Sequence, residues 1–149
     1  MNPALIEEEN FDRARKKIRE NRGKEIIFAG SNDETNRKVL EKENINIFLL
    51  KQKGRKDRQK QRDSGLDSVL AKFAKKKNVI IGIDYDELMN SEGKEKAEIL
   101  SRIKQNIKIC NKEKLKMKFI SNSKNKASRY DLVALGLVLG MSTSTIKDL

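Results

Sequence analysis

The sequence predicts an α/β protein in which parallel strands form a sheet covered on both faces by helices. Four short apolar segments, rich in Ile, Val and Phe, alternate with helical patterns along the chain. Alternation of this kind, with strands that are apolar throughout, is typical of parallel sheets. The 149 residues suit one domain, and 36% hydrophobic residues are enough for a core. We therefore expect a single domain over residues 1–149.

The expected strands have the length and the β-branched composition of buried strands. They are residues 25–30, 45–50, 78–83 and 116–121. The segments between them predict helices at 32–43, 64–77 and 92–113, and a last helix that begins near residue 129. A helix at 11–21 precedes the first strand, so we expect residues 1–22 to form a helical N-terminal segment.

Three Ser-x-x-acid pairs predict where helices begin, because the hydroxyl and the carboxylate can accept hydrogen bonds from the backbone N–H groups of the first turn. They are Ser31 with Glu34, Ser64 with Asp67, and Ser128 with Asp131. Each pair follows an expected strand. Strand-to-helix connections emerge at the carboxyl edge of a parallel sheet, so these three connections should share one edge.

Two of these connections are rich in basic residues. Residues 51–63 carry seven Lys or Arg against two Asp, and residues 121–129 add further Lys and Arg. Together they predict one positive surface, although solvated charge runs without a partner are the alternative. The expected RNA-contacting residues are Arg37, Arg55, Lys56, Arg58, Lys60, Arg62, Lys124, Lys126 and Arg129. The expected polar residues at the carboxyl edge are Asn36, Asp63, Ser121 and Ser123.

The overall charge also favours a polyanionic partner. The chain has 34 Lys and Arg against 22 Asp and Glu, a formal charge of +12. Nucleic acid is the leading candidate, because no apolar stretch approaches the roughly 18 residues that would span a membrane. The charged start lacks the apolar centre of a signal peptide, and one cysteine permits no internal disulfide. We expect a cytoplasmic protein. By contrast, Lys75, Lys76 and Lys77 end a helix at the opposite edge, where they complement its dipole.

Several catalytic classes are excluded by composition. The chain has no histidine, which rules out Ser-His and Cys-His dyads and His-containing zinc sites. Cys110 continues a helical apolar stripe and is expected in the core. We expect no catalytic residue, no metal and no cofactor in the chain itself. The alternative is a metal-dependent phosphoesterase that uses only the carboxylates Asp84, Asp86 and Glu87, although the last two more simply begin a short helix.

Four segments of the chain resemble archaeal ribonuclease P protein component 3 in order and spacing. They are "ETNRKVLEKENINIFLL", "DSGLDSVLAKFAKKKNVIIGI", "ILSRIKQNIKICNK" and "FISNSKNKASRYDL". The similarity covers about residues 23 to 141. Its most specific parts are the Asn36-Arg37 pair, the helix start at 63–66 and the strand end at Ile120-Ser121.

The resemblance implies a TIM-barrel-like fold, related to the PHP phosphoesterases but without their metal site. It also implies an RNA-binding subunit that assists the catalytic RNA of ribonuclease P, which removes the 5′ leader of precursor tRNA with Mg²⁺. The implied partners are this RNA, precursor tRNA indirectly, and ribonuclease P protein component 2. A general basic RNA-binding or ribosome-associated protein remains the alternative.

The chain departs from the family pattern in length. Complete members carry further βα units before and after the matched segments, so we expect a shortened member, a partial barrel of about four to five units. An open parallel sheet leaves strand edges unpaired. A complementing chain or self-association is therefore expected to cover them.

Overall fold

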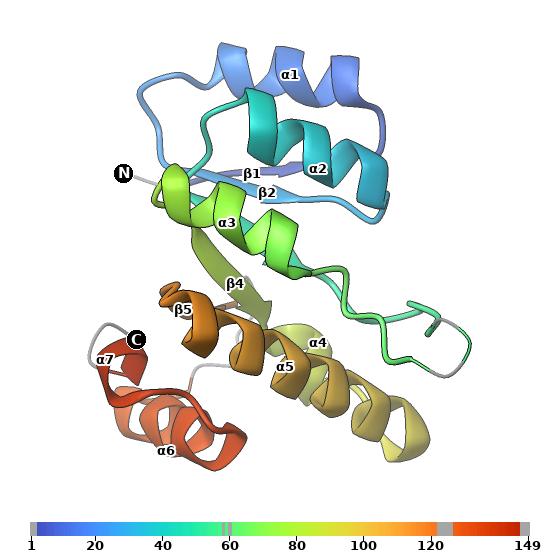
Figure 1. Ribbon diagram of the computed structural model, residues 1–149, viewed down its shortest axis with the longest axis vertical. Helices are drawn as coiled ribbons and strands as arrows, with labels where there is room; N and C mark the ends of the chain where they lie inside the picture. The colour runs from blue at the N-terminus through green and yellow to red at the C-terminus, as the bar shows by residue number, and fades with distance from the viewer. Residues whose placement is uncertain (1–2, 58, 60, 122–126, 147–149) are drawn as a thin grey trace.

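Five parallel strands form one sheet in the order β1-β2-β3-β4-β5 (Figure 1). This computed structural model describes residues 3–57, 59, 61–121 and 127–146. The strands are β1 Ala4–Glu7, β2 Ile26–Ala29, β3 Ile47–Leu50, β4 Ile80–Asp84 and β5 Met117–Ile120. Strands that are neighbours in the chain are also neighbours in the sheet, which is the order of a βα barrel. The expected partial TIM-like barrel of four to five βα units is confirmed.

Each connection between neighbouring strands contains at least one helix. The helices are α1 Phe11–Glu20, α2 Asp33–Lys42, α3 Ser68–Lys76, α4 Tyr85–Met89 and α5 Gly93–Glu113, followed after β5 by α6 Arg129–Leu139 and α7 Thr143–Ile146. The four expected strands and five expected helices are all present. Within the described part of the chain, no helix is both long and apolar enough to cross a membrane.

The expectation that residues 1–22 are only helical is wrong, because β1 precedes α1. Ala4–Glu7 pairs in parallel with β2, from Ala4 beside Ile26 to Glu7 beside Ala29. Of the four residues only Ile6 is buried, since β1 is an edge strand with one face against the helices. A four-residue strand with one buried side chain has too little periodicity to be distinguished in the sequence.

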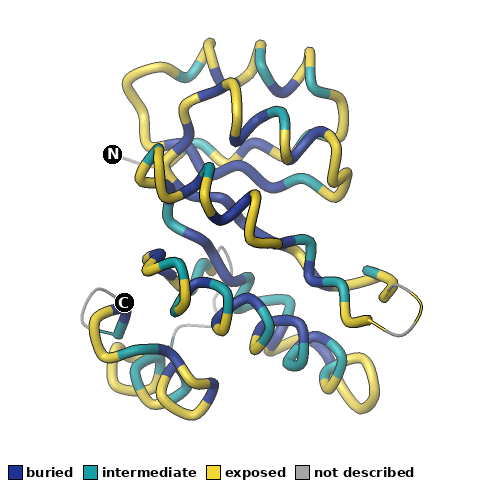
Figure 2. The backbone as a smooth tube through the Cα atoms, in the orientation of Figure 1, coloured by how far each residue is buried: buried dark blue, intermediate teal, exposed yellow. Residues whose placement is uncertain are grey.

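The helices pack on one face of the sheet, so the expectation of cover on both faces is wrong. Successive strand residues point to opposite faces. Phe28 and Phe48 stack on the helical side, with ring centroids 6.4 Å apart. Ile27 and Ile47 belong to a second apolar cluster. Among the described residues, all members of this cluster come from the strands. The second face is that of an open barrel interior. Figure 2 shows the buried strands beneath the exposed outer sides of the helices.

Two of the three predicted helix caps are displaced. The α2 cap is Asn32, whose side chain accepts from Thr35 N, and the α3 cap is Asp67, which accepts from Leu70 N. Ser128 caps α6 as expected. Asn and Asp are as good as Ser at this position, so local pattern alone could not choose among neighbours. Ser64 instead lies buried at the end of the connection after β3.

Cys110 is a core residue, as its place in the apolar stripe of α5 predicts. The side chain is fully buried among apolar neighbours. Burial raises the pKa of its thiol to about 12. A thiol that stays protonated at neutral pH is a poor nucleophile.

Gly30 directly follows β2 and lies against the side chain of Asn36. Asn36 Nδ2 donates to the Gly30 carbonyl oxygen at 2.9 Å. A Cβ at Gly30 would lie 2.1 Å from Asn36 Oδ1 and 3.1 Å from the ring of Phe28. Both neighbours are buried in the close-packed interior, so neither can move away freely. The carboxyl end of β2 therefore requires glycine.

We expect Gly30→Ala to destabilise the protein by about 2 kcal/mol through overpacking, measured by urea unfolding. Asn36→Ala should also destabilise, because it removes the hydrogen bond to the Gly30 carbonyl. The double variant should cost less than the sum of the two, since Asn36→Ala removes the atom that the new methyl group meets. Strict additivity would show that this contact does not exclude alanine.

Candidate nucleic-acid interface

The two predicted basic connections begin at the same edge of the sheet. The basic loop, residues 51–67, leaves the carboxyl end of β3, and the connection to α6 leaves the carboxyl end of β5, with β4 between them. Figure 1 shows the basic loop projecting beyond the sheet, at the end opposite to the chain's N-terminus. The parallel topology alone decides this placement.

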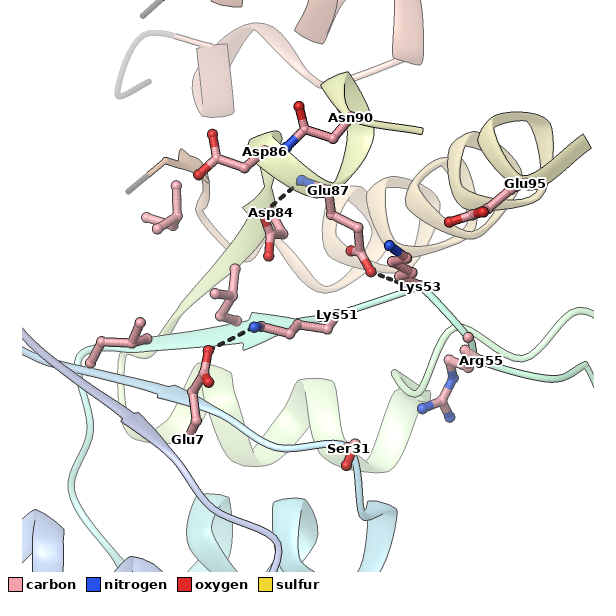
Figure 3. A pocket seen from close by; sticks show the side chains of 14 residues that line it. Glu7, Ser31, Lys51, Lys53, Arg55, Asp84, Asp86, Glu87, Asn90 and Glu95 are labelled. Carbon is pink, nitrogen blue, oxygen red and sulfur yellow. Dashed lines mark hydrogen bonds and ion pairs between the residues drawn. The ribbon is translucent and has the colours of Figure 1, made fainter. Parts of the chain in front are cut away.

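The base of the basic loop is anchored by Glu87 on α4. Its carboxylate accepts hydrogen bonds from the backbone amides of Gln52, at 2.9 Å, and Lys53 (Figure 3). Burial raises the pKa of the Glu87 carboxyl, although these two hydrogen bonds oppose the shift. The buried side chain of Gln52 donates to the carbonyl oxygen of Ser64 at 2.9 Å and thereby joins the two ends of the loop.

Arg55 is engaged by two carboxylates within the protein. Its guanidinium contacts both oxygens of Asp33, at 3.1 and 2.9 Å, and Asp63 Oδ1 at 2.9 Å. Its Nε also donates to the Asp63 carbonyl oxygen at 2.7 Å. The side chain is only 12% exposed. A guanidinium with these partners holds the loop against α2 and has little capacity left for a phosphate.

Asp57 forms the centre of a second ion-pair cluster. Arg102 of α5, almost fully buried, donates from Nε to Asp57 Oδ1 at 3.1 Å and from Nη1 to the Gln52 carbonyl oxygen at 3.3 Å. Arg62 contacts the other carboxylate oxygen at 3.2 Å, and the Asp63 amide donates to Oδ1 at 2.9 Å. The loop is therefore folded onto α5 and is not a solvated tether.

These contacts shift the pKa values of the charged groups in the direction that keeps them ionised. The Asp63 amide, with Arg102 in support, lowers the pKa of the Asp57 carboxyl against the opposing effect of desolvation. Desolvation lowers the pKa of Arg55, but the hydrogen bonds to Asp33 and Asp63 outweigh it and the pKa is raised. Asp57 and Arg55 therefore stay charged at neutral pH.

The predicted RNA-contacting residues fall into four groups. Arg55 and Arg62 are held in ion pairs, whereas Arg37 and Lys56 are exposed and make no ion pair with another described residue. Arg129 is the exposed first residue of α6 and has a further interaction partner. Outside the described residues lie Arg58, Lys60, Lys124 and Lys126.

The three described residues of the predicted polar set lie at the carboxyl edge, with different surroundings. Asn36 lies on the buried face of α2, so its side chain does not face solvent. Asp63 belongs to the Arg55 cluster. Ser121 Oγ donates to Asp86 at 2.6 Å. Ser123 is outside the described residues. Direct RNA contact by this whole set stays a prediction.

Acidic residues interrupt the positive charge of this edge. One hollow there is lined by Glu7, Asp84, Asp86 and Glu95 as well as by Lys51, Lys53 and Arg55 (Figure 3). Lys51 is paired with Glu7, Nζ to Oε1, at 2.6 Å. Helix first turns carry acids at this edge because they complement the helix dipoles. The described part of the edge is thus mixed in charge and not uniformly positive.

The carboxylates of the alternative phosphoesterase site are each used for a different purpose. Asp84 caps α4 by accepting from the Glu87 amide at 3.0 Å, and Asp86 accepts from Ser121. Glu87 anchors the basic loop. Among the described residues, no three His, Cys, Asp or Glu side chains are arranged to hold a metal ion. The geometry gives this alternative no support.

Sequence reasoning missed Arg102, which organises the basic loop. The residue lies on the buried face of α5, beside Ile99, Ile103 and Asn106. An arginine on the apolar face of a helix requires a buried partner. That signal was present in the sequence, but its partner Asp57 lies 45 residues away and could not be identified from spacing.

We expect Asp57→Asn to release the basic loop, because it leaves the buried Arg102 guanidinium without its counter-charge. Limited proteolysis should then cut within residues 51–67 faster than in the unchanged protein. Asp12→Asn, which removes an exposed carboxylate from α1, is the control and should leave the cleavage rate unchanged.

Acid should have the same effect as this substitution. The folded pKa of Asp57 lies below its ordinary 3.8. Its stabilisation is therefore complete above that value and is lost as the pH falls through the lowered pKa. Equal cleavage of the unchanged protein and Asp57→Asn at neutral pH would contradict the role of Asp57.

Comparison with known proteins connects this structure with ribonuclease P. No family model matches the chain. It is 30% identical over 134 residues to ribonuclease P protein component 3 of Methanocaldococcus jannaschii, covering 87% of this chain and 55% of that protein. It is also 30% identical over 122 residues to the protein of the same name from Methanococcoides burtonii, covering 78% of this chain and 46% of that protein.

A solved structure agrees with the sequence comparison. A chain in the cryo-EM structure of archaeal ribonuclease P with mature tRNA superimposes with a TM-score of 0.80 and 26% identity, covering 95% of this chain and 61% of that one. The chain spans about half the length of the curated relatives it matches. The resemblance seen in the sequence is thereby confirmed, and the chain is similar to archaeal ribonuclease P protein component 3 over most of its own length.

Proposed function

We propose that the chain is an RNA-binding protein subunit of ribonuclease P. It assists the catalytic RNA in removing the 5′ leader of precursor tRNA. Two similarities carry this proposal: that of the sequence to component 3, and that of the fold to a chain in a solved archaeal ribonuclease P, each over most of this chain. The excess of 34 basic over 22 acidic residues supports it, because such a charge favours a polyanionic partner.

The catalytic work in this proposal belongs to the RNA. The chain has no histidine, and the carboxylates Asp84, Asp86 and Glu87 at its carboxyl edge are hydrogen-bonded within the protein. Mg²⁺ therefore serves the RNA, and the protein contributes binding and positioning. The proposed partners are ribonuclease P RNA directly, precursor tRNA through that RNA, and ribonuclease P protein component 2.

Reconstitution tests the proposal. Addition of the chain with component 2 to archaeal ribonuclease P RNA should increase cleavage of precursor tRNA at low Mg²⁺, because protein cations replace part of the Mg²⁺ that screens RNA phosphates. The measurement is the initial rate of 5′-leader release on a gel. An unrelated basic RNA-binding protein of similar charge is the control.

Two outcomes would contradict the assignment. If the rate does not change when the chain is added, the chain is not a ribonuclease P subunit. If the control protein increases the rate equally, the effect is only electrostatic, and the general RNA-binding alternative is favoured.

We also propose that a second polypeptide covers an open edge of the sheet. β1 and β5 each have a strand neighbour on one side only. Leu137 and Val138 of α6 are 55% and 79% exposed, which is costly for large apolar side chains. A parallel strand beside β5, with its own helix against α6, would cover the open edge of β5 and these two side chains. A complementing chain or a second copy could supply it.

We expect the purified chain to associate with itself or with a co-purified partner in sedimentation velocity. Val138→Asp should weaken this association, because it places a charge in the contact. Val69→Asp, on an exposed position of α3 that is 47% accessible, is the matched control. A stable monomer, or equal effects of the two substitutions, would contradict the proposal.

A further inference from the structure

Positive charge is also concentrated away from the carboxyl edge. Residues 68–78 contain four lysines and no acidic residue, and residues 99–118 contain six lysines with Glu113 as the one acid. These segments form α3, the carboxyl-terminal part of α5, and the turns that follow them toward the amino edge of the sheet. The amino edge therefore carries a second concentration of positive charge, with Glu113 as the one acid in these two segments.

Exposed lysines follow the outer sides of two adjacent helices. α3 and α5 lie side by side in the helical layer (Figure 1), and Lys75 Nζ of α3 donates to the Lys114 carbonyl oxygen, just after α5, at 2.9 Å. We name Lys72 and Lys76 of α3 with Lys104, Lys108 and Lys112 of α5 the amino-end lysine surface. All five are exposed.

The spacing of these lysines places them in rows on the outer surface. Residues four apart lie on one side of a helix, about 6 Å apart along its axis. The opposite sides of both helices are buried, with Ala71 and Ala74 in α3 and Ile103 and Ile107 in α5. Both rows therefore face outward from the same helical layer.

Helix dipoles do not account for the whole surface. A lysine complements the dipole only within the last turn. Lys76 and Lys112 meet this condition, but Lys72, Lys104 and Lys108 lie further from the helix ends. No ion pair within the described residues neutralises any of the five. Such a concentration of like charge costs stability unless an anion offsets it.

The chemistry of the surface favours phosphates over an acidic protein. Protein interfaces depend on apolar or aromatic anchors at their centres and are depleted in lysine. The large exposed apolar residues of the described chain, Val69 of α3 among them, do not come from the carboxyl-terminal halves of α3 and α5. Lysine presents a compact charge that contacts phosphates without reading sequence.

We propose that the amino-end lysine surface is a second RNA-binding surface, which contacts the phosphate backbone of ribonuclease P RNA at the end of the molecule opposite to the basic loop. The inference rests on the proposed function, since the RNA is the polyanion that this function supplies. The RNA would then contact both the carboxyl edge and the outer helical face.

The two ends of α5 provide a matched test. K108Q/K112Q removes two charges from the amino-end lysine surface, and K94Q/K96Q removes two from the other end of the same helix, beside Glu92, Glu95 and Glu98. Both variants lower the net charge equally and keep good helix formers. Circular dichroism melts confirm that each variant is folded.

The measurement is filter binding to transcribed Methanocaldococcus jannaschii ribonuclease P RNA over a range of KCl concentrations. K108Q/K112Q should weaken binding several-fold and reduce the slope of log K against log [KCl] by about 1.5, the effect of losing two phosphate contacts. K94Q/K96Q should leave both quantities unchanged. Equal effects of the two variants, no effect of either, or no binding by the unchanged chain would overturn the inference.

This result is independent of the cleavage assay. If K108Q/K112Q alone weakens RNA binding but the chain does not increase precursor-tRNA cleavage, the surface stands and the ribonuclease P assignment fails. If cleavage increases but binding is insensitive to K108Q/K112Q, the assignment stands and the RNA binds elsewhere.

Discussion

Parallel pairing of consecutive strands is the constraint on which the rest of the structure depends. When each strand pairs with the next in sequence, every helix must return across the same face, and every connection from strand to helix begins at the same edge. The five strands follow this rule from β1 to β5. The helix first turns therefore share one end of the molecule with the basic loop, and the helix last turns share the other.

This arrangement also separates charge along the molecule. Helix dipoles favour acids near first turns and lysines near last turns. Asp33 and Glu34 in α2 and Asp131 in α6 follow the first preference, and Lys75 and Lys112 follow the second. The lysines on the outer sides of α3 and α5 extend the positive end well beyond what the dipoles require. The lysines there are accompanied by few acids, whereas Asp33, Asp57 and Asp63 interrupt the positive charge of the basic loop.

Part of the positive charge of the basic loop is paired within the protein, although its composition predicts charge that is available to a partner. Its arginines are used in part for internal structure, because Arg55 and Arg62 pair with Asp33, Asp57 and Asp63. Arg102 and Glu87 form hydrogen bonds with the backbone of Gln52 at the start of the loop. These anchors hold the exposed Lys56 close to the folded protein, so less entropy would be lost if the proposed RNA bound there.

The sequence by itself determined the α/β class, four of the five strands, the five longer helices and the core position of Cys110, because apolar periodicity is a local property of the chain. It also carried the family resemblance. The folded structure was needed to distinguish charges that are paired within the protein from charges that are available to a partner. Asp57 and Arg102 are 45 residues apart, and Arg55 and Asp33 are 22 apart. Whether such a charge serves the fold or a partner depends on three-dimensional distance, and residue counts along the chain do not contain that information.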